Sequence, residues 1–219
     1  MQPYFLPYLG YWQLIHAVDK FVILDDVQFI TKGWINRNKI YVNGKDQWIT
    51  IPLEGANRNK LINELKICSP NNWAAKLQRT IEYNFKKAPN FEEGYQLFQS
   101  IINFKTNDLT TLLVRSIKLI CNFLNIQTEV ILSSDITSIN SLKGQARIIY
   151  ICKKLNSSFY YNPQGGIDLY KKEDFTKENI QLNFVRTNSK SSFLYSFLES
   201  MMMYSRNEIR NELNNFNLI

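Results

Sequence analysis

The sequence contains a single histidine, His16, and this scarcity limits the chemistry open to the chain. A protein metal centre commonly uses several histidine ligands, and a serine or cysteine nucleophile commonly needs a histidine base beside it. His16 fits a position in a helix better than a catalytic role, and no set of Cys, His and Asp residues has the spacing of metal ligands. We therefore expect no metal ion and no bound cofactor.

Cysteine is also sparse. Cys68, Cys121 and Cys152 form no C-x-x-C pair, which fits a reducing cytosol and implies no disulfide framework. No apolar run reaches the roughly 18 residues that suggest a membrane-spanning helix. The start lacks the basic and apolar regions of a signal peptide. We expect a cytoplasmic protein that does not insert into membranes.

Dense basic blocks are missing, although the net charge is +7. Scattered Lys and Arg side chains attract anions such as nucleotides, phosphosugars or RNA, but they do not mark a dedicated nucleic-acid surface. The 219 residues are 45% hydrophobic, which predicts one domain spanning 1–219. The sequence leaves the oligomeric state open.

Secondary structure follows from local patterns of apolar residues, turn residues and helix caps. We expect strands at 21–29, 61–67, 128–136 and 158–166, a hairpin at 39–53 turning at Asn43-Gly44, helices at 70–85, 91–104, 108–125 and 142–155, and a fraying surface helix from 204. Strands that alternate with helices predict an α/β fold. Its partly parallel, twisted, Rossmann-like sheet would have flanking helices and an antiparallel hairpin excursion.

Asp25 and Asp26 are the strongest candidates for catalysis. They follow an apolar, β-branched run, so a buried strand would deliver them to its carboxyl end. A partly desolvated crevice there would raise the pKa of one carboxyl group toward that of a useful general base. In the alternative interpretation, one carboxylate caps the following turn and the other is solvated.

Several donors follow within a few residues, in the stretch QFITKGWINRN. A guanidinium offers a bidentate fork and an amide offers both a donor and an acceptor, which suits a phosphate or a carboxylate beside a sugar hydroxyl. The alternative is an exposed strand start with ordinary surface charge. The candidate substrate-binding residues here are Gln28, Lys32, Trp34, Asn36, Arg37 and Asn38.

Two further strand ends carry small polar residues. Glycines after an apolar strand let backbone N–H groups approach an anion, although the NPQGG stretch lacks the pattern of a phosphate-binding loop. Taken alone, each is a turn. The sheet would bring them to the crevice that holds Asp25, and the candidates are Ser134, Asp135, Asn162, Gln164, Gly165 and Gly166.

Five stretches together carry a resemblance to a known family: MQPYFLPYLGYWQLI, AVDKFVILDDVQFITKGWINRNKI, TIPL, NPQGG-x-x-LY and SFLESMMMY. They are similar to the WbqC-like family of bacterial proteins over essentially the whole chain. Members are typically encoded among genes for O-antigen, lipopolysaccharide and other surface polysaccharides, which implies work on nucleotide-linked amino sugars. Members usually begin several residues earlier, so the resemblance implies a first strand that is shortened here or begins upstream.

A fainter similarity concerns the loop of nucleotidyltransferases and class I synthetases in which a proline precedes H-x-G-H. Here Pro7 precedes Tyr8-Leu9-Gly10-Tyr11, with tyrosine at both histidine positions. If the loops are related, nucleotide phosphates would lie over Gly10 at a helix N-terminus. Gln2 and Tyr4 could also point into the crevice, so the substrate-binding candidates of this segment are Gln2, Tyr4, Tyr8, Gly10 and Tyr11.

The resemblance implies a transferase that attaches an aminoacyl group, foremost glycyl, or an acyl group to the amine of a nucleotide-linked amino sugar. Asp25 or Asp26 would deprotonate the ammonium, and Arg37 with Asn36 and Asn38 would hold the pyrophosphate or the donor. The donor could be a thioester, an acyl-phosphate or an aminoacyl-tRNA. The alternatives are a non-catalytic protein that binds a nucleotide sugar or organises partner enzymes, and a nucleotidyltransferase-like enzyme.

Overall fold

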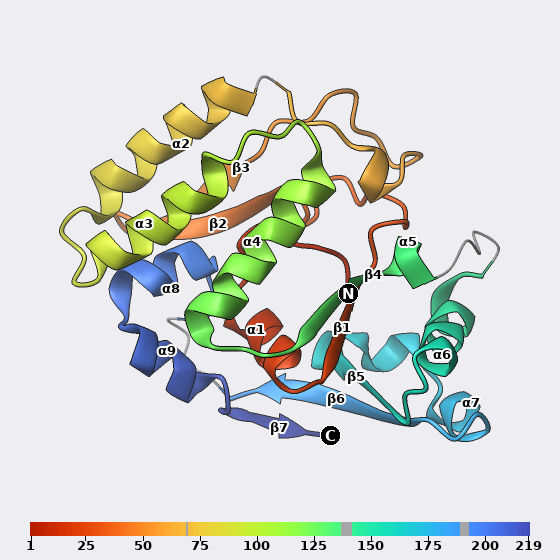
Figure 1. The fold of residues 1–219 in the computed structure, drawn as a ribbon. Helices are drawn as coiled ribbons and strands as arrows, with labels where there is room; N and C mark the ends of the chain where they lie inside the picture. Colours follow the sequence, from red (N-terminus) through yellow and green to blue (C-terminus); the bar gives the residue numbers. More distant parts are fainter. Residues whose placement is uncertain (69, 137–141, 189–192) are drawn as a thin grey trace.

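The structure is a computed structural model, and it describes residues 1–68, 70–136, 142–188 and 193–219 (Figure 1). Its α-helices are α1 (Leu9–His16), α2 (Pro70–Phe85), α3 (Phe91–Ile102), α4 (Leu109–Leu124), α5 (Ser133–Ile136), α6 (Gly144–Lys154), α7 (Lys172–Thr176), α8 (Phe197–Met203) and α9 (Arg206–Glu212). Its strands are β1 (Lys20–Ile23), β2 (Arg37–Val42), β3 (Lys45–Thr50), β4 (Glu129–Leu132), β5 (Phe159–Pro163), β6 (Gln181–Thr187) and β7 (Phe216–Leu218). Two short 3₁₀ helices are η1 (Ile62–Glu64) and η2 (Gln164–Leu169).

The strands confirm a mixed α/β fold. β1 pairs in parallel with β4, and β5 pairs in parallel with β6, whose other edge holds β7 in antiparallel orientation. β2 and β3 form the expected antiparallel hairpin. Its turn uses Asn43 and Gly44 at φ 53° and 76°, the left-handed geometry that a two-residue primed turn requires.

Local signals for the long helices are also confirmed. The carboxylate of Asp108 caps α4 by accepting a hydrogen bond from the Thr111 N–H at 2.7 Å. At the other end, Asn125 adopts a left-handed conformation, φ 56°, which ends the helix. α3 and α4 each bury one apolar face, as their spacing of Phe, Leu and Ile predicts.

Two strand predictions are wrong in part or in full. β1 stops at Ile23, and the backbone beyond it bonds individually to residues 60–63 instead of continuing a ladder. Residues 61–67 form η1 and isolated bridges, because their buried side chains, Ile62, Leu65 and Ile67, do not alternate with period two along the stretch.

The two later strand predictions need smaller changes. The strand predicted at 128–136 ends at Leu132 and turns into α5. The strand predicted at 158–166 ends at Pro163 and turns into η2.

The prediction of a surface helix from 204 is confirmed in part. α9 is a helix with mostly exposed residues, and it begins with a reciprocal capping box between Ser205 and Glu208. Ile209 is fully buried, Leu213 is 2% exposed, and the segment continues into β7, which pairs with β6. A few apolar residues therefore anchor an otherwise exposed segment, and its fraying stays a prediction.

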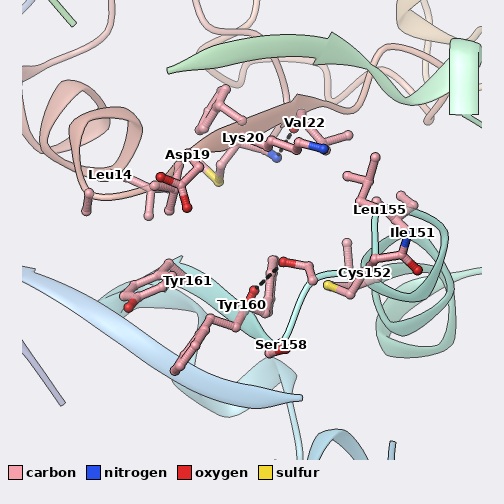
Figure 2. A pocket seen from close by; sticks show the side chains of 18 of the residues that line it. Leu14, Asp19, Lys20, Val22, Ile151, Cys152, Leu155, Ser158, Tyr160 and Tyr161 are labelled. Carbon is pink, nitrogen blue, oxygen red and sulfur yellow. Dashed lines mark hydrogen bonds between the residues drawn. The ribbon is translucent and has the colours of Figure 1, made fainter. Parts of the chain in front are cut away.

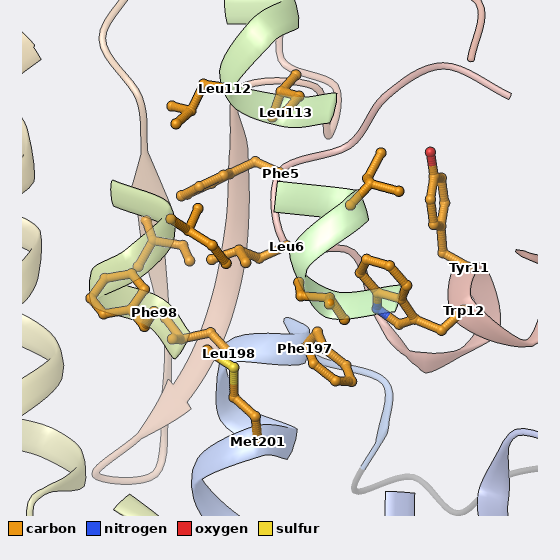
Figure 3. Close-up of a cluster of buried hydrophobic side chains, with 14 of the residues drawn as sticks. Phe5, Leu6, Tyr11, Trp12, Phe98, Leu112, Leu113, Phe197, Leu198 and Met201 are labelled. Atoms are coloured by element: carbon orange, nitrogen blue, oxygen red, sulfur yellow. The ribbon is translucent and has the colours of Figure 1, made fainter. Parts of the chain in front are cut away.

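The larger core forms around the N-terminal stretch. Figure 3 shows Phe5, Leu6 and Trp12 among side chains of α3, α4 and α8, which include Phe98, Leu113 and Phe197. Phe5, Leu6 and Trp12 have no exposed surface. A smaller cluster packs α6 and α7 against β5 and β6, and contains Ile148, Phe175, Ile180, Leu182 and Phe184 among others.

The parallel strands do not form the single sheet that we predicted. Figure 2 shows β1 and β5 facing each other across a cavity of about 460 Å³. Met1 pairs with this edge of β1: its amino group donates to the Val22 carbonyl oxygen at 2.8 Å, and its own carbonyl accepts from the Leu24 N–H at 2.7 Å. This is the bonding pattern of parallel strands. The longer first strand implied by the resemblance stays a prediction.

For a chain prepared to start at Met1, burial of its free amino group predicts a pH-dependent stability. Burial lowers the pKa of this amine from 8.0 to about 5. The unfolded chain therefore binds more protons between these values, and the free energy of unfolding should fall as the pH is lowered from about 8 to about 5, by up to roughly 4 kcal/mol. Urea unfolding across this pH range measures the slope.

The matched control is the same chain acetylated at the Met1 nitrogen. Acetylation keeps an N–H donor for the Val22 carbonyl but removes the titrating charge. The acetylated chain should lose this part of the pH dependence. Equal slopes for the two forms would contradict the assignment.

Candidate functional site

The candidate site lies where β1 and β4 end together. Ile23 is paired with Leu132 in the last register position of the parallel pair. The chain beyond each strand therefore reaches the same edge, which brings Asp25 and Asp26 beside Ser133 and Ser134. Both carboxylates are buried, with Asp25 2% and Asp26 9% exposed. This confirms that β1 delivers the pair to its carboxyl end.

Asp25 is held by donors on both carboxylate oxygens. Oδ1 accepts from the Ser133 hydroxyl at 3.2 Å and from the Ser134 N–H at 3.1 Å. Oδ2 accepts from the Ser134 hydroxyl at 2.7 Å and from the Asn63 side-chain amide at 3.5 Å. The backbone carbonyl of Asp25 also accepts from the Asn63 N–H at 2.9 Å. These bonds fix Asp25 to both α5 and η1.

Asp26 forms a buried ion pair with Arg147 of α6, and both side chains are 8% exposed. Its Oδ1 atom accepts from Arg147 Nη2 and from the Ser133 hydroxyl. Within the described residues, its hydrogen bonds all use Oδ1. The Oδ2 atom of Asp26 therefore receives no hydrogen bond from the described residues.

The acidic and basic groups of this cluster are unequal in number. Two carboxyl groups share one guanidinium among the described residues, and such a set suits a ligand that brings a further cation, for example an ammonium group. The Arg147 Nε atom is buried and has no hydrogen-bond partner among the described residues. The cluster thus has an oxygen, Asp26 Oδ2, that could accept a hydrogen bond from a ligand, and an N–H group, Arg147 Nε, that could donate one. In the described part of the chain, no group of three or more His, Cys, Asp and Glu residues could hold a metal ion.

Three residues of this cluster were not among the predicted site residues: Arg147, Ser133 and Asn63. Arg147 could have been found, because it lies within the apolar stripe of α6 with Ile148 and Ile151, and a charge on a buried helix face needs a partner. Ser133 is adjacent to the predicted Ser134. Asn63 gives no signal, because its place depends on the irregular segment 61–67.

Of the two predicted residues after β4, Ser134 belongs to this cluster and Asp135 has no described contact with it. Ser134 bonds to Asp25 through its N–H and its hydroxyl. Asp135 is exposed on α5.

The predicted residues after β5 pack among themselves. Asn162 is 6% exposed. Its side-chain amide nitrogen would be 2.2 Å from a Cβ atom added to Gly166, so Asn162 packs directly against this glycine. Gln164 and Gly165 are exposed. No hydrogen bond between the described parts of this loop and the Asp25–Asp26 pair is formed, so its binding role stays a prediction.

The predicted donors of residues 28–38 point in different directions. Asn38 is buried and donates to the carbonyls of Phe5 and Leu6, and Asn36 donates to the Ile51 carbonyl. These two amides therefore hold the backbone together. The others are at the surface or partly exposed: Gln28, Lys32, Trp34 and Arg37.

Of the N-terminal candidates, Tyr11 is buried, Gln2, Tyr4 and Gly10 are partly buried, and Tyr8 is exposed. Tyr11 is 1% exposed and donates to the Gln2 carbonyl at 3.0 Å, and Tyr4 packs against it. Tyr8 immediately precedes α1, and its ring covers Gly10, where an added Cβ would lie 2.4 Å from a ring carbon. The space that we expected to admit a phosphate above Gly10 is filled by this ring.

Comparison with known proteins adds a family to this geometry. The model of the WbqC-like protein family matches residues 2–203. The chain belongs to the WbqC-like protein family. It is 34% identical over 137 residues to the uncharacterised protein Rv1507c of Mycobacterium tuberculosis (strain ATCC 25618 / H37Rv). That match covers 62% of this chain and 59% of the relative, so the chain spans about three-fifths of the relative's length. No solved structure matches.

The ion pair of this WbqC-like chain can be tested by its effect on stability. Replacing Arg147→Met leaves the Asp26 carboxylate buried without its counter-charge, which should lower the free energy of unfolding by about 3–5 kcal/mol. The double variant with Asp26→Asn should lose less than the sum of the two single changes. Urea unfolding measures all three variants.

The control is Arg79→Met, which changes an exposed arginine on α2. It should stay within about 0.5 kcal/mol of the unaltered chain. Equal stability of the Arg147 and Arg79 variants would show that the buried pair contributes nothing.

Proposed function

We propose that this chain is a cytoplasmic transferase of surface-polysaccharide biosynthesis. It attaches an aminoacyl group, foremost glycyl, or an acyl group to the amine of a nucleotide-linked amino sugar. The observation that carries the proposal is the buried pair of carboxyl groups, Asp25 and Asp26, which share one guanidinium among the described residues. An amino sugar brings the ammonium group that complements it. Membership in the WbqC-like family supports the setting.

Asp26 is the proposed general base, and Asp25 is the positioning residue. Asp25 accepts bonds on both oxygens, whereas the bonds that Asp26 forms with described residues leave Oδ2 available. The Ser133 hydroxyl is within hydrogen-bond distance of both carboxylates, although it has only one hydrogen to donate. It therefore links the position of the Asp25 side chain to that of Asp26.

The proposed reaction is direct attack on an activated acyl group. Asp26 takes a proton from the sugar ammonium, and the freed nitrogen lone pair forms a bond to the acyl carbonyl carbon. The bond from this carbon to the leaving group then breaks, and its electron pair departs with a sulfur, a phosphate or the terminal ribose oxygen of a tRNA. The second proton that the nitrogen must lose passes to this departing group, which leaves a neutral amide. No serine, cysteine or lysine nucleophile is needed, because the donor is already activated.

The described part of the chain is compatible with this setting in one further respect: it contains no helix long and apolar enough to cross a membrane.

The second candidate is a non-catalytic protein that binds a nucleotide sugar or organises partner enzymes. One observation favours it: protein groups already satisfy both oxygens of Asp25 and one of Asp26, as in a cluster that only stabilises the fold. The nucleotidyltransferase alternative has less support, since the ring of Tyr8 covers Gly10. It would release pyrophosphate from a nucleoside triphosphate, and we expect none.

The test is turnover of a nucleotide-linked 4-amino sugar with a glycyl thioester, glycyl phosphate or glycyl-tRNA, followed by mass spectrometry for the added glycyl group. Asp26→Asn should lower the rate at least about 100-fold, because the general base is lost. Asp25→Asn should also lower it, through misplacement of Asp26. Glu92→Gln, which changes an exposed carboxylate on α3, is the control and should keep the full rate.

Urea unfolding of each variant separates a lost base from a lost fold. Unchanged rates in both aspartate variants would remove the acid–base role. Tight binding of the nucleotide sugar with no product from any of the three donors would favour the binding protein.

A further inference from the structure

The outer face of the β2–β3 hairpin carries exposed aromatic rings. Alternate residues of an antiparallel pair share one face, and here the buried Ile40 and Ile49 occupy the inner one. Trp48 is 42% exposed and Tyr41 is 47% exposed on the outer face, and Trp34, just before β2, is 45% exposed beside them. We call this surface the hairpin platform; it consists of Trp34, Arg37, Lys39, Tyr41, Asp46, Trp48 and Tyr195.

The rings of the platform form two pairs. The centroids of Trp34 and Trp48 are 5.7 Å apart with 30° between ring planes, and those of Tyr41 and Tyr195 are 5.4 Å apart with 32°. Trp48 is paired with Lys39 in the ladder, and Lys39 lies two residues before Tyr41 on β2. Same-face positions two residues apart are separated by about 7 Å, which matches the spacing of successive bases in an extended strand of nucleic acid.

Cations lie among these rings. The guanidinium carbon of Arg37 is 4.1 Å from the centroid of the Trp48 ring, and Lys39 Nζ is 5.0 Å from it. Arg37 is held there, because its Nε donates to the Gly33 carbonyl at 3.1 Å. Lys32 and Lys45 are exposed at the two ends of the hairpin region.

The acidic groups of the platform are already paired. Asp46 accepts from Lys39 Nζ at 2.7 Å and from the Tyr195 hydroxyl at 3.0 Å. These two donors hold the pKa of Asp46 below its ordinary value. The neighbouring Glu199 accepts from the Tyr41 N–H at 2.8 Å. Arg37 on the outer face and the exposed Lys32 near it therefore supply positive charge to the platform, whereas Lys45, paired with Val42, is on the inner face of the ladder.

We propose that the hairpin platform binds the unpaired end of an RNA, with two successive bases on the two ring pairs and phosphates beside the cations. Aromatic rings interleaved with cations are the elements that bind single strands. A second copy of this chain fits less well, since it would place Lys32 and Arg37 against their own equivalents. The choice of RNA rests on the proposed function, in which an aminoacyl-tRNA is one candidate donor and carries its acyl group on an unpaired 3′ end.

The test is fluorescence anisotropy with a labelled RNA of eight nucleotides ending in CCA, measured over a range of salt concentrations. Trp34→Ala should weaken binding about 5- to 150-fold, as for loss of one stacked base. Arg37→Gln should weaken binding and lower the slope of log affinity against log salt by about 1. The control is Tyr83→Ala, which removes a ring that is 79% exposed on α2 and should leave the affinity unchanged.

Absence of salt-dependent RNA binding, or equal affinity of the Trp34 and Tyr83 variants, would overturn the proposal. So would a DNA of the same sequence that binds as tightly, or a dimer that Trp34→Ala dissociates. Binding is measured without turnover, so the two proposals can fail separately. Glycyl transfer from a thioester without RNA binding removes the platform alone, and RNA binding without product from any donor removes the transferase alone.

Discussion

Buried backbone carbonyls at the N-terminus govern how the rest of the chain packs. The carbonyl oxygens of Phe5, Leu6 and Pro7 lie inside the larger core, and a buried carbonyl without a donor is costly. Asn38 of β2 donates to two of them, Ser196 before α8 donates to Leu6 at 2.8 Å, and the Trp12 indole of α1 donates to Pro7 at 3.0 Å. Two segments far apart in the sequence, and the helix that follows directly, are therefore tied to one short stretch.

The same arrangement explains an unusual backbone conformation. Leu6 has φ 46°, a region that residues with a side chain rarely adopt. Its carbonyl accepts from Asn38, Ser196 and the Phe197 N–H, and its side chain is fully buried. Surrounding contacts of this kind are needed to keep a strained residue in place. The two prolines and the aromatic residues around Leu6 thus build the core. The buried Asn38 side chain of the hairpin donates hydrogen bonds to this stretch.

The Asp25–Asp26 cluster follows the same rule with charges in place of carbonyls. Carboxylates this deeply buried need donors, and the start of α5, η1 and one turn of α6 supply them. The cluster also differs from the N-terminal stretch, because one acceptor on Asp26 and the Nε donor of Arg147 have no partner among the described residues. That unfilled capacity makes it a candidate for ligand binding as well as a support of the fold.

Short-range chemistry determined the parts of the structure that the sequence predicted. Asn43-Gly44 encodes the hairpin turn, Asp108 encodes the start of α4, and the apolar run before Asp25 encodes a strand that ends in two carboxylates. Tertiary structure alone decided which polar residues meet. Arg147 reaches Asp26 across 121 positions, Asn38 turns inward to Leu6 while Arg37 turns outward to Trp48, and residues 61–67 bend around buried side chains. The physical reason is that a turn or a cap is satisfied by its neighbours in sequence, whereas a buried charge or carbonyl is satisfied by whichever donor the packed core brings to it.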